Sequence, residues 1–131
     1  MRFALMLVTD PALGEPVAKT EAALAAAPSG RVAVQARMKG APARGLADLV
    51  RALAPICRAA GAPLFVNDRA DVARACGADG VHLPERGLRV DEARAVLGPG
   101  AWIGRSCHDR AGLERAARGG ASYATLAPIG R

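Results

Sequence analysis

Polar side chains follow several short apolar runs of this 131-residue chain, where their types could bind phosphate, hold a cation or move protons. Gln35, Arg37 and Lys39 alternate with other residues after the apolar residues Val32 and Val34. Residues two apart in a strand point to the same side, so these three would face one side, the lumen of a barrel. Arg37 can bind two phosphate oxygens at once, and Lys39 adds a compact positive charge. The alternative is a solvent-facing edge strand with the two valines on its other face.

A second group of candidates carries carboxylate, amide and imidazole chemistry. Asn67 and Asp68 end another apolar run, where a carboxylate beside an amide could take one position on a magnesium ion shared with substrate phosphates. The same pair could instead cap a helix that begins near Arg69. His82 and His108 could transfer protons, although a lone histidine more often makes structural hydrogen bonds. No spacing among these residues indicates a zinc site.

These side chains need strands and helices to position them, and the sequence predicts an alternation of both. Each expected strand is a short apolar run, as buried parallel strands require. The expected strands are Phe3–Thr9, Val32–Gln35, Leu64–Asn67, Gly80–Leu83, Trp102–Gly104 and Tyr123–Ala127. Helices are expected near 15–27, 44–60, 69–76, 90–97 and 109–118. The order is a repeated βα unit followed by a last strand.

Local signals mark the ends of these elements. A Gly-Ala pair beginning at Gly61, Gly77 or Gly120 ends a helix and opens a strand, since glycine readily takes the left-handed conformation. Asp109 has a side chain suited to capping the helix that follows it. Pro55 is expected to kink its helix or end it early. Repeated βα units close into a barrel or form an open doubly wound sheet.

Composition limits the class of protein. The net charge of +6 comes mostly from arginines scattered through helical stretches without interleaved aromatic residues, which argues against nucleic-acid binding. Three cysteines without a Cys-x-x-Cys pair indicate neither a disulfide framework nor a zinc site, so a cytoplasmic location is expected. No apolar run approaches a membrane span, and no membrane partner is expected. Whether the protein forms a homo-oligomer is left open, because no interface patch stands out in the sequence.

Five motifs in order resemble those of the thiamine phosphate synthase/TenI family. They are Leu7-Val8-Thr9-Asp10, Gln35-x-Arg37-x-Lys39, Asn67-Asp68-Arg69-x-Asp71, Gly77-Ala78-Asp79-Gly80-Val81-His82-Leu83 and Ile103-Gly104-Arg105-Ser106-x-His108. The resemblance covers nearly the whole chain and favours a TIM-type (β/α) barrel over the open sheet. With six strands in the chain, about six of the eight strands of such a barrel are expected here.

The resemblance implies a thiamine-biosynthesis transferase. Synthases of the family join hydroxymethylpyrimidine diphosphate to thiazole phosphate and release diphosphate, with the help of Mg²⁺. The resemblance assigns the diphosphate to a set of polar residues: Gln35, Arg37, Lys39, Asn67 and Ser106. Asp68 would ligate magnesium, and His108 occupies the place of a proton-transferring histidine.

Two departures from the synthase pattern keep alternatives open. Synthases usually carry Gly-Gln-x-Asp after the segment of His82, with its Asp as second magnesium ligand, whereas this chain has Pro84-Glu85-Arg86-Gly87. Glu85 or Asp71 are the acids that could replace it. The Ile-Gly-Arg-Ser-x-His form is closer to the TenI branch, which tautomerises thiazole phosphate through a histidine.

The chain also ends at Gly130-Arg131, where family members continue through two more strands. Residues 1–131 are therefore expected to be a single but incomplete barrel domain. A thiazole tautomerase and an inactive member that only binds the phosphorylated ligand are the alternative functions.

Overall fold

A computed structural model describes residues 3–128, which fold into one parallel six-stranded sheet with helices between its strands. The predicted end of the chain at Gly130-Arg131 lies outside the described residues. The strands are β1 (Leu5–Val8), β2 (Val32–Ala36), β3 (Leu64–Asn67), β4 (Gly80–Leu83), β5 (Trp102–Cys107) and β6 (Tyr123–Leu126). The helices are α1 (Pro16–Ala26), α2 (Ala43–Ala60), α3 (Ala70–Cys76), α4 (Val90–Leu97) and α5 (Arg110–Arg118), with a 3₁₀ turn at Pro11–Leu13.

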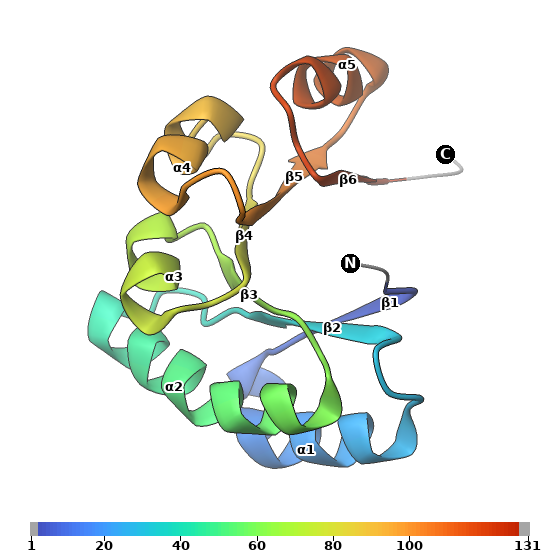
Figure 1. Cartoon of the computed structure of the whole chain (residues 1–131), viewed down its shortest axis with the longest axis vertical. Helices are drawn as coiled ribbons and strands as arrows, with labels where there is room; N and C mark the ends of the chain where they lie inside the picture. The colour runs from blue at the N-terminus through green and yellow to red at the C-terminus, as the bar shows by residue number, and fades with distance from the viewer. Residues whose placement is uncertain (1–2, 129–131) are drawn as a thin grey trace.

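The strands follow one another across the sheet in chain order, and every neighbouring pair is parallel. The helices lie along the outside of a curved sheet, which leaves its concave side free of helices (Figure 1). An open doubly wound sheet would reverse its strand order and carry helices on both faces. The prediction of a TIM-type fold with six strands in this chain is therefore confirmed, and the described residues form a half-barrel.

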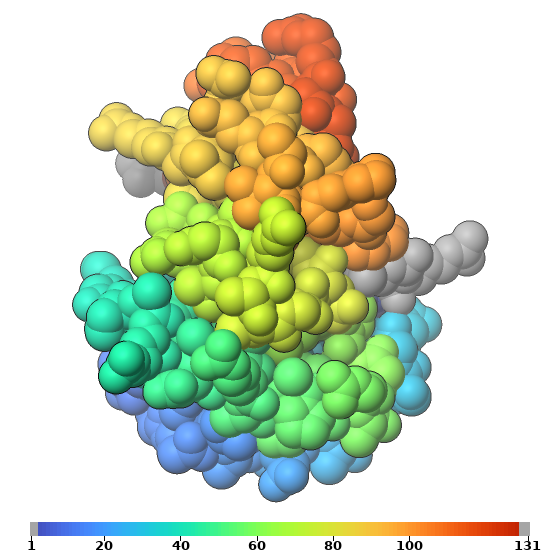
Figure 2. Space-filling model, turned by 60° about the vertical axis from the view of Figure 1, so that its left-hand side comes forward, coloured from blue at the N-terminus to red at the C-terminus, as the bar shows by residue number. Residues whose placement is uncertain are grey.

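The main core lies between the sheet and the helices. Alternate strand residues such as Val34, Val66 and Val81 are fully buried there and belong to one apolar cluster with Leu53 of α2. Helices α2, α3 and α4 pack side by side over this outer face (Figure 2). The other alternate residues of the strands therefore point to the concave side, where the polar candidates lie.

Caps and connectors form where the sequence predicts them. Gly61 and Gly77 end α2 and α3 with φ of 66° and 67°, a conformation that glycine adopts without steric cost. The Asp109 carboxylate accepts a hydrogen bond from the Gly112 amide at 2.8 Å and so caps α5. These local rules fix the order of the elements.

The helix predicted over 44–60 is confirmed as α2, which does not end early at Pro55 because its buried apolar stripe outweighs the loss of one helical hydrogen bond. Two expectations about strand ends were wrong. Strand β2 ends at Ala36, so it does not extend to Lys39. Strand β5 continues past Gly104 to Cys107, because it pairs on both sides with β4 and β6.

The two outer strands of the sheet are much more exposed than the inner ones. Within residues 3–128, β1 pairs with β2 and β6 with β5, and each has an unpaired second edge. Leu5 on β1 is 68% exposed and Leu126 on β6 is 39% exposed. Among the described residues, no helix is both long and apolar enough to cross a membrane.

Candidate functional site

A cavity of about 310 Å³ opens where β2 and β3 end, and it collects four of the predicted site residues. Arg37, Lys39, Asn67 and Asp68 line it, with Arg69 beside them. The carboxyl ends of parallel strands meet at one edge of a sheet, so residues about 30 positions apart in sequence come together here. Two cations facing one carboxylate make this cavity suitable for an anionic ligand that also carries a metal ion.

Thr9 holds the backbone from which Arg37 extends. Its hydroxyl accepts a hydrogen bond from the Arg37 amide at 2.9 Å and donates to the Arg37 carbonyl at 3.0 Å. Thr9 is itself buried at the end of β1, whereas the side chains of Arg37 and Lys39 are exposed. The two cations therefore project from a fixed loop into solvent at the mouth, rather than into the lumen beside Gln35.

Asp68 has the left-handed backbone conformation, with φ of 65°. Its amide donates a hydrogen bond to the His82 carbonyl at 2.8 Å, which holds this unusual conformation in place. Among residues 3–128, no hydrogen bond or ion pair engages its carboxylate. A strained non-glycine backbone with a free carboxylate at the mouth is typical of a functional position.

Asp71, one of the acids considered as a replacement metal ligand, is already engaged. It forms two hydrogen bonds to Arg69, at 2.7 and 3.0 Å. The Arg69 guanidinium lowers the pKa of the Asp71 carboxyl. Asp71 therefore neutralises Arg69.

Gln35 lies inside the lumen and connects the strands rather than lining the cavity. Its Oε1 accepts a hydrogen bond from Asn67 Nδ2 at 2.8 Å, and its Nε2 donates to Met6 Sδ at 3.2 Å. Only 4% of Gln35 is exposed, so these contacts satisfy a buried amide. Gln35 thus orients Asn67 at the cavity, and the predicted row of ligands divides into a lumen part and a mouth part.

His82 and Ser106 also face the lumen, and the structure joins them to Tyr123. The His82 ring lies between two hydroxyl groups, with Nδ1 at 2.8 Å from Tyr123 Oη and Nε2 at 2.7 Å from Ser106 Oγ. Burial lowers the pKa of His82, so the imidazole is neutral near pH 7. Burial likewise raises the pKa of the Tyr123 phenol, which keeps its proton.

Aromatic rings fill the lumen below His82. The ring of Tyr123 meets Phe3 and Phe65 edge to face, with centroid distances of 5.8 and 5.7 Å. Gly104 makes room for it, because a Cβ at this position would overlap the Tyr123 ring. The rings therefore cluster at the amino ends of the strands, and the polar groups lie nearer the carboxyl ends.

His108 lies at the mouth, apart from the lumen network. Its Nδ1 is 2.7 Å from the Ala127 carbonyl, which can only accept a hydrogen bond, so Nδ1 carries a proton. Its Nε2 is 4.0 Å from Glu85 Oε2, a buried oxygen without a hydrogen-bond partner among the described residues. The two side chains form an acid/base pair separate from the cavity that Asp68 lines.

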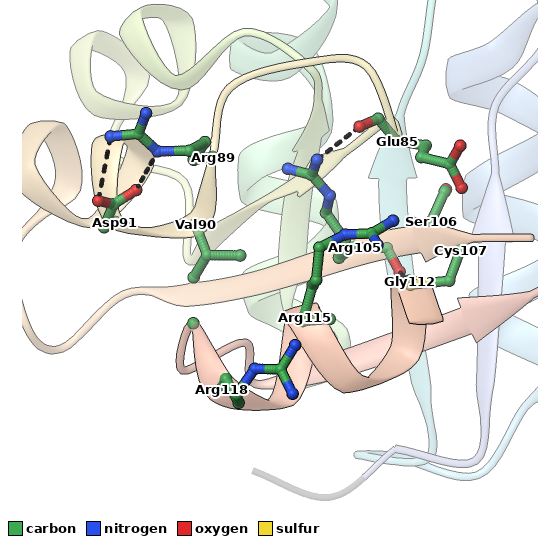
Figure 3. Close-up of a pocket in the computed structure, with 12 residues that line it drawn as sticks. Glu85, Arg89, Val90, Asp91, Arg105, Ser106, Cys107, Gly112, Arg115 and Arg118 are labelled. Carbon is green, nitrogen blue, oxygen red and sulfur yellow. Dashed lines mark hydrogen bonds and ion pairs between the residues drawn. The ribbon is translucent and has the colours of Figure 1, made fainter. Parts of the chain in front are cut away.

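A larger cavity of about 640 Å³ lies on the outer side of β5, between α4 and α5 (Figure 3). Arg105 points into it and donates hydrogen bonds to the carbonyls of Leu88 and Glu85, which hold the loop between β4 and α4. Of the predicted site residues, only Ser106 contributes to its lining. This cavity therefore lies behind the sheet rather than at its ligand-binding edge.

Cys57 is not placed to act as a nucleophile. All three cysteines are free, and Cys57 and Cys107 are buried. Burial raises the pKa of Cys57 to about 11, so its thiol stays protonated. Because the thiolate is the reactive form, Cys57 is a packing residue.

Tyr123 and Met6 are the lumen residues that sequence reasoning missed. Tyr123 opens β6, and its hydroxyl meets a histidine 41 residues earlier in the chain. The available signal was Gly104, a glycine inside a strand, which often marks close approach of another group. Met6 looks like any apolar strand residue, and nothing in its own segment indicates that it accepts a hydrogen bond from Gln35.

Comparison with known proteins agrees with this geometry. A family model described as "Thiamine monophosphate synthase" (TMP-TENI) matches residues 5–131. A "Thiamine-phosphate synthase" of Methanoculleus marisnigri is 44% identical, covering 98% of this chain and 61% of its own length. One of Gloeobacter violaceus is 43% identical over 95% of this chain and 36% of its own length.

The solved structure of "Thiamine phosphate pyrophosphorylase" from Pyrococcus furiosus superimposes with a TM-score of 0.88 and is 31% identical. That match covers 98% of this chain and 61% of the Pyrococcus chain. The chain therefore spans about three-fifths of the relatives that it matches most fully. With a family model matched over nearly its entire length, this chain belongs to the thiamine monophosphate synthase (TMP-TENI) family.

Proposed function

We propose that the protein acts as a thiamine phosphate synthase, joining hydroxymethylpyrimidine diphosphate to thiazole phosphate with release of diphosphate. The observation that carries this proposal is the cavity at the ends of β2 and β3. It brings two cations, an amide and a carboxylate without a partner among the described residues to the edge where parallel β/α folds bind ligands. Membership of the family supplies the substrate class.

The residues of the cavity and lumen would share the diphosphate between them. Arg37 and Lys39 would hold its oxygens and neutralise the charge that grows as the diphosphate departs. Asn67, oriented by Gln35, would donate a hydrogen bond to the same group. Ser106 would donate from the lumen side. Asn67 and Ser106 are already held by hydrogen bonds to Gln35 and His82, so these two donors would act with little reorganisation.

Asp68 fits a magnesium ion that arrives with the substrate. Among residues 3–128, no group of three or more His, Cys, Asp or Glu side chains is placed to hold a metal. Mg²⁺ is commonly bound by one or two carboxylates together with substrate phosphates and water. Bound by Asp68, it would supply further neutralisation of the diphosphate charge.

Pro84 and Gly87 explain why a second carboxylate is missing. A Cβ on Gly87 would lie 2.9 Å from Cγ and Cδ of Pro84 and 3.1 Å from Asp68 Oδ1. Position 87 therefore faces Asp68, as a second metal ligand would, but the proline ring leaves space for glycine alone. Proline at position 84 and glycine at position 87, where synthases usually have Gly and Asp, are therefore coupled through this one contact.

The paired variant Pro84→Gly/Gly87→Asp should bind Mg²⁺ at least about tenfold more tightly than the natural chain, since two carboxylates would face one cation. Mg²⁺ affinity from calorimetry, and the rise of the unfolding temperature on adding Mg²⁺, both measure this. Gly87→Asp alone should destabilise the fold because of the Pro84 ring. An unchanged affinity in the paired variant would show that position 87 does not face the metal.

Assays on the 131-residue chain test the proposed function. Release of inorganic diphosphate should need both substrates and Mg²⁺, and EDTA should abolish it. Arg37→Ala should weaken binding of inorganic diphosphate by about tenfold or more, because a charged hydrogen-bonded group is lost. Arg44→Ala, on the exposed side of α2, is the matched control. The proposal would be ruled out if the natural chain neither released diphosphate nor bound it.

The His108–Glu85 pair favours thiazole tautomerase as a second candidate. With Nδ1–H committed to Ala127, Nε2 of the neutral ring is free to take a proton, and Glu85 lies where it can stabilise the protonated ring. This reaction would need no metal. His108→Ala should then abolish tautomerisation and spare magnesium-dependent diphosphate release. Ligand binding without either reaction would indicate an inactive family member.

We further propose that residues 1–131 form a single domain and that the protein is cytoplasmic. Its partners would be small phosphorylated pyrimidines and thiazoles. Free cysteines support a reducing compartment. The continuous sheet and shared core of residues 3–128 support one folding unit.

A further inference from the structure

The lumen contains a chain of hydrogen bonds that includes one group from each of the six strands. Asn67 donates to Gln35, Gln35 donates to Met6, Tyr123 lies near Met6, and His82 lies between Tyr123 and Ser106. His82 is 5% exposed and neutral, so one ring nitrogen carries the proton and the other accepts one. Which nitrogen carries it decides what Ser106 can do.

Two arrangements of the protons are compatible with the distances. In the first, Tyr123 donates to Nδ1 of His82, and the Nε2–H donates to Ser106 Oγ. The hydroxyl proton of Ser106 is then free for a ligand. In the second, Nδ1–H donates to Tyr123 and Ser106 donates to Nε2, so that its only proton is used inside the lumen.

Met6 distinguishes the two arrangements. In the second, the Tyr123 proton would need another acceptor, and the nearest is Met6 Sδ at 3.7 Å. Thioether sulfur is a weak acceptor, and this one already accepts from Gln35 Nε2 at 3.2 Å. In the first, the phenol donates at 2.8 Å to an imidazole lone pair, a much stronger acceptor. In the first arrangement both ring nitrogens of His82 and the Tyr123 phenol have strong partners, and only the proton of the half-buried Ser106 hydroxyl has none among the described residues.

We propose that His82 is a positioning residue, held by Tyr123 as the Nε2–H tautomer, which donates to Ser106 and so keeps the Ser106 hydroxyl proton available to an anionic ligand. The ligand-binding part rests on the proposed role of Ser106 toward the substrate diphosphate. Within residues 3–128, Ser106 Oγ makes no hydrogen bond other than that to His82. Its proton therefore has no acceptor among the described residues, and an anionic ligand can provide one.

The state of His82 can be read directly by nitrogen NMR of the natural chain with ¹⁵N-labelled histidine. The chain has two histidines, and His108→Gln assigns the spectrum. At a pH where both rings are neutral, His82 should show a pyrrole-type Nε2 and a pyridine-type Nδ1. His108, whose Nδ1 faces a carbonyl, should show the opposite pattern. A pyrrole-type Nδ1 in His82 would overturn the proposal without any variant.

Tyr123→Phe tests what holds the tautomer, because it keeps the ring among Phe3 and Phe65 and removes only the hydroxyl. The Nδ1 signal of His82 should move toward that of a pyridine-type nitrogen without a hydrogen bond. An unmoved Nδ1 signal would show that Tyr123 does not donate to it. If the unfolding temperatures of Tyr123→Phe and of the natural chain agree within a few degrees, the fold of the variant is intact.

Titration with inorganic diphosphate tests the link to the ligand. As Ser106 donates to the anion, its oxygen becomes a better acceptor, so the His82 Nε2–H proton signal should move downfield. Ser106→Ala should remove this response and weaken diphosphate binding about ten- to a hundredfold. Ser29→Ala, an exposed serine, is the matched control. Diphosphate binding with an unchanged His82 signal would refute the positioning role alone, whereas absent binding would count against the proposed function and leave the tautomer result standing.

Discussion

Gly104→Ala should lower the free energy of unfolding by about 3 kcal/mol, at the upper end of what one extra methyl group costs in a packed core. The added Cβ would overlap the ring of Tyr123. That ring cannot move aside easily, because Phe3 and Phe65 hold its faces and edges and His82 holds its hydroxyl. The overlap must instead push β5 and β6 apart, at the strand that carries Ser106.

Urea unfolding followed by the fluorescence of Trp102, the single tryptophan, measures this change. Gly100→Ala is the matched control, since a Cβ there meets nothing within 4 Å and the residue lies in a surface turn. In a Tyr123→Ala background the penalty should nearly vanish, because the overlapping ring is gone. An equal loss in both backgrounds would show that Tyr123 is not what excludes a side chain at position 104.

Asp68→Gly should leave the fold at least as stable as the natural chain while reducing diphosphate release by about a hundredfold. Asp68 has φ of 65°, a conformation that glycine takes freely and other residues take at a cost of about 1 kcal/mol. Glycine relieves this strain, although the freer unfolded chain offsets part of the gain. It also removes the carboxylate that faces the cavity of Arg37 and Lys39.

Asp68→Ala is the informative partner of this variant. It removes the same carboxylate but keeps a side chain in the left-handed conformation, so it should be about 1 kcal/mol less stable than Asp68→Gly. Thermal unfolding and the initial rate of diphosphate release, measured on both variants, separate strain from chemistry. If both variants keep full activity, the role assigned to Asp68 is wrong.

The order of the elements could be predicted from the sequence because it depends on neighbours along the chain. Short apolar runs separated by amphipathic stretches indicate a repeated βα unit, and the glycines at 61 and 77 end helices for a local steric reason. The end of β5 could not be predicted in this way, because its pairing with β4 and β6 carries it past Gly104 to Cys107. The family motifs likewise depend on residues close together in sequence.

The division of the candidate site into a lumen part and a mouth part could not be predicted in this way. Gln35 and Arg37 share one alternation, yet one is buried in the lumen and the other exposed at the mouth, because β2 ends between them at Ala36. The coupling of Pro84 with Gly87 depends on a turn whose geometry brings position 87 toward β3. Both outcomes follow from where the chain turns in space.

By itself, then, the sequence determined that this is a parallel β/α protein of a recognisable family with phosphate-binding residue types at its strand ends. Only the tertiary structure decided that Tyr123, His82 and Ser106, from three different strands, form one hydrogen-bonded chain across the lumen. The physical reason is that hydrophobic periodicity and helix caps act over a few residues. Contacts across a concave sheet depend instead on its curvature and on which ring fills the space that a glycine leaves.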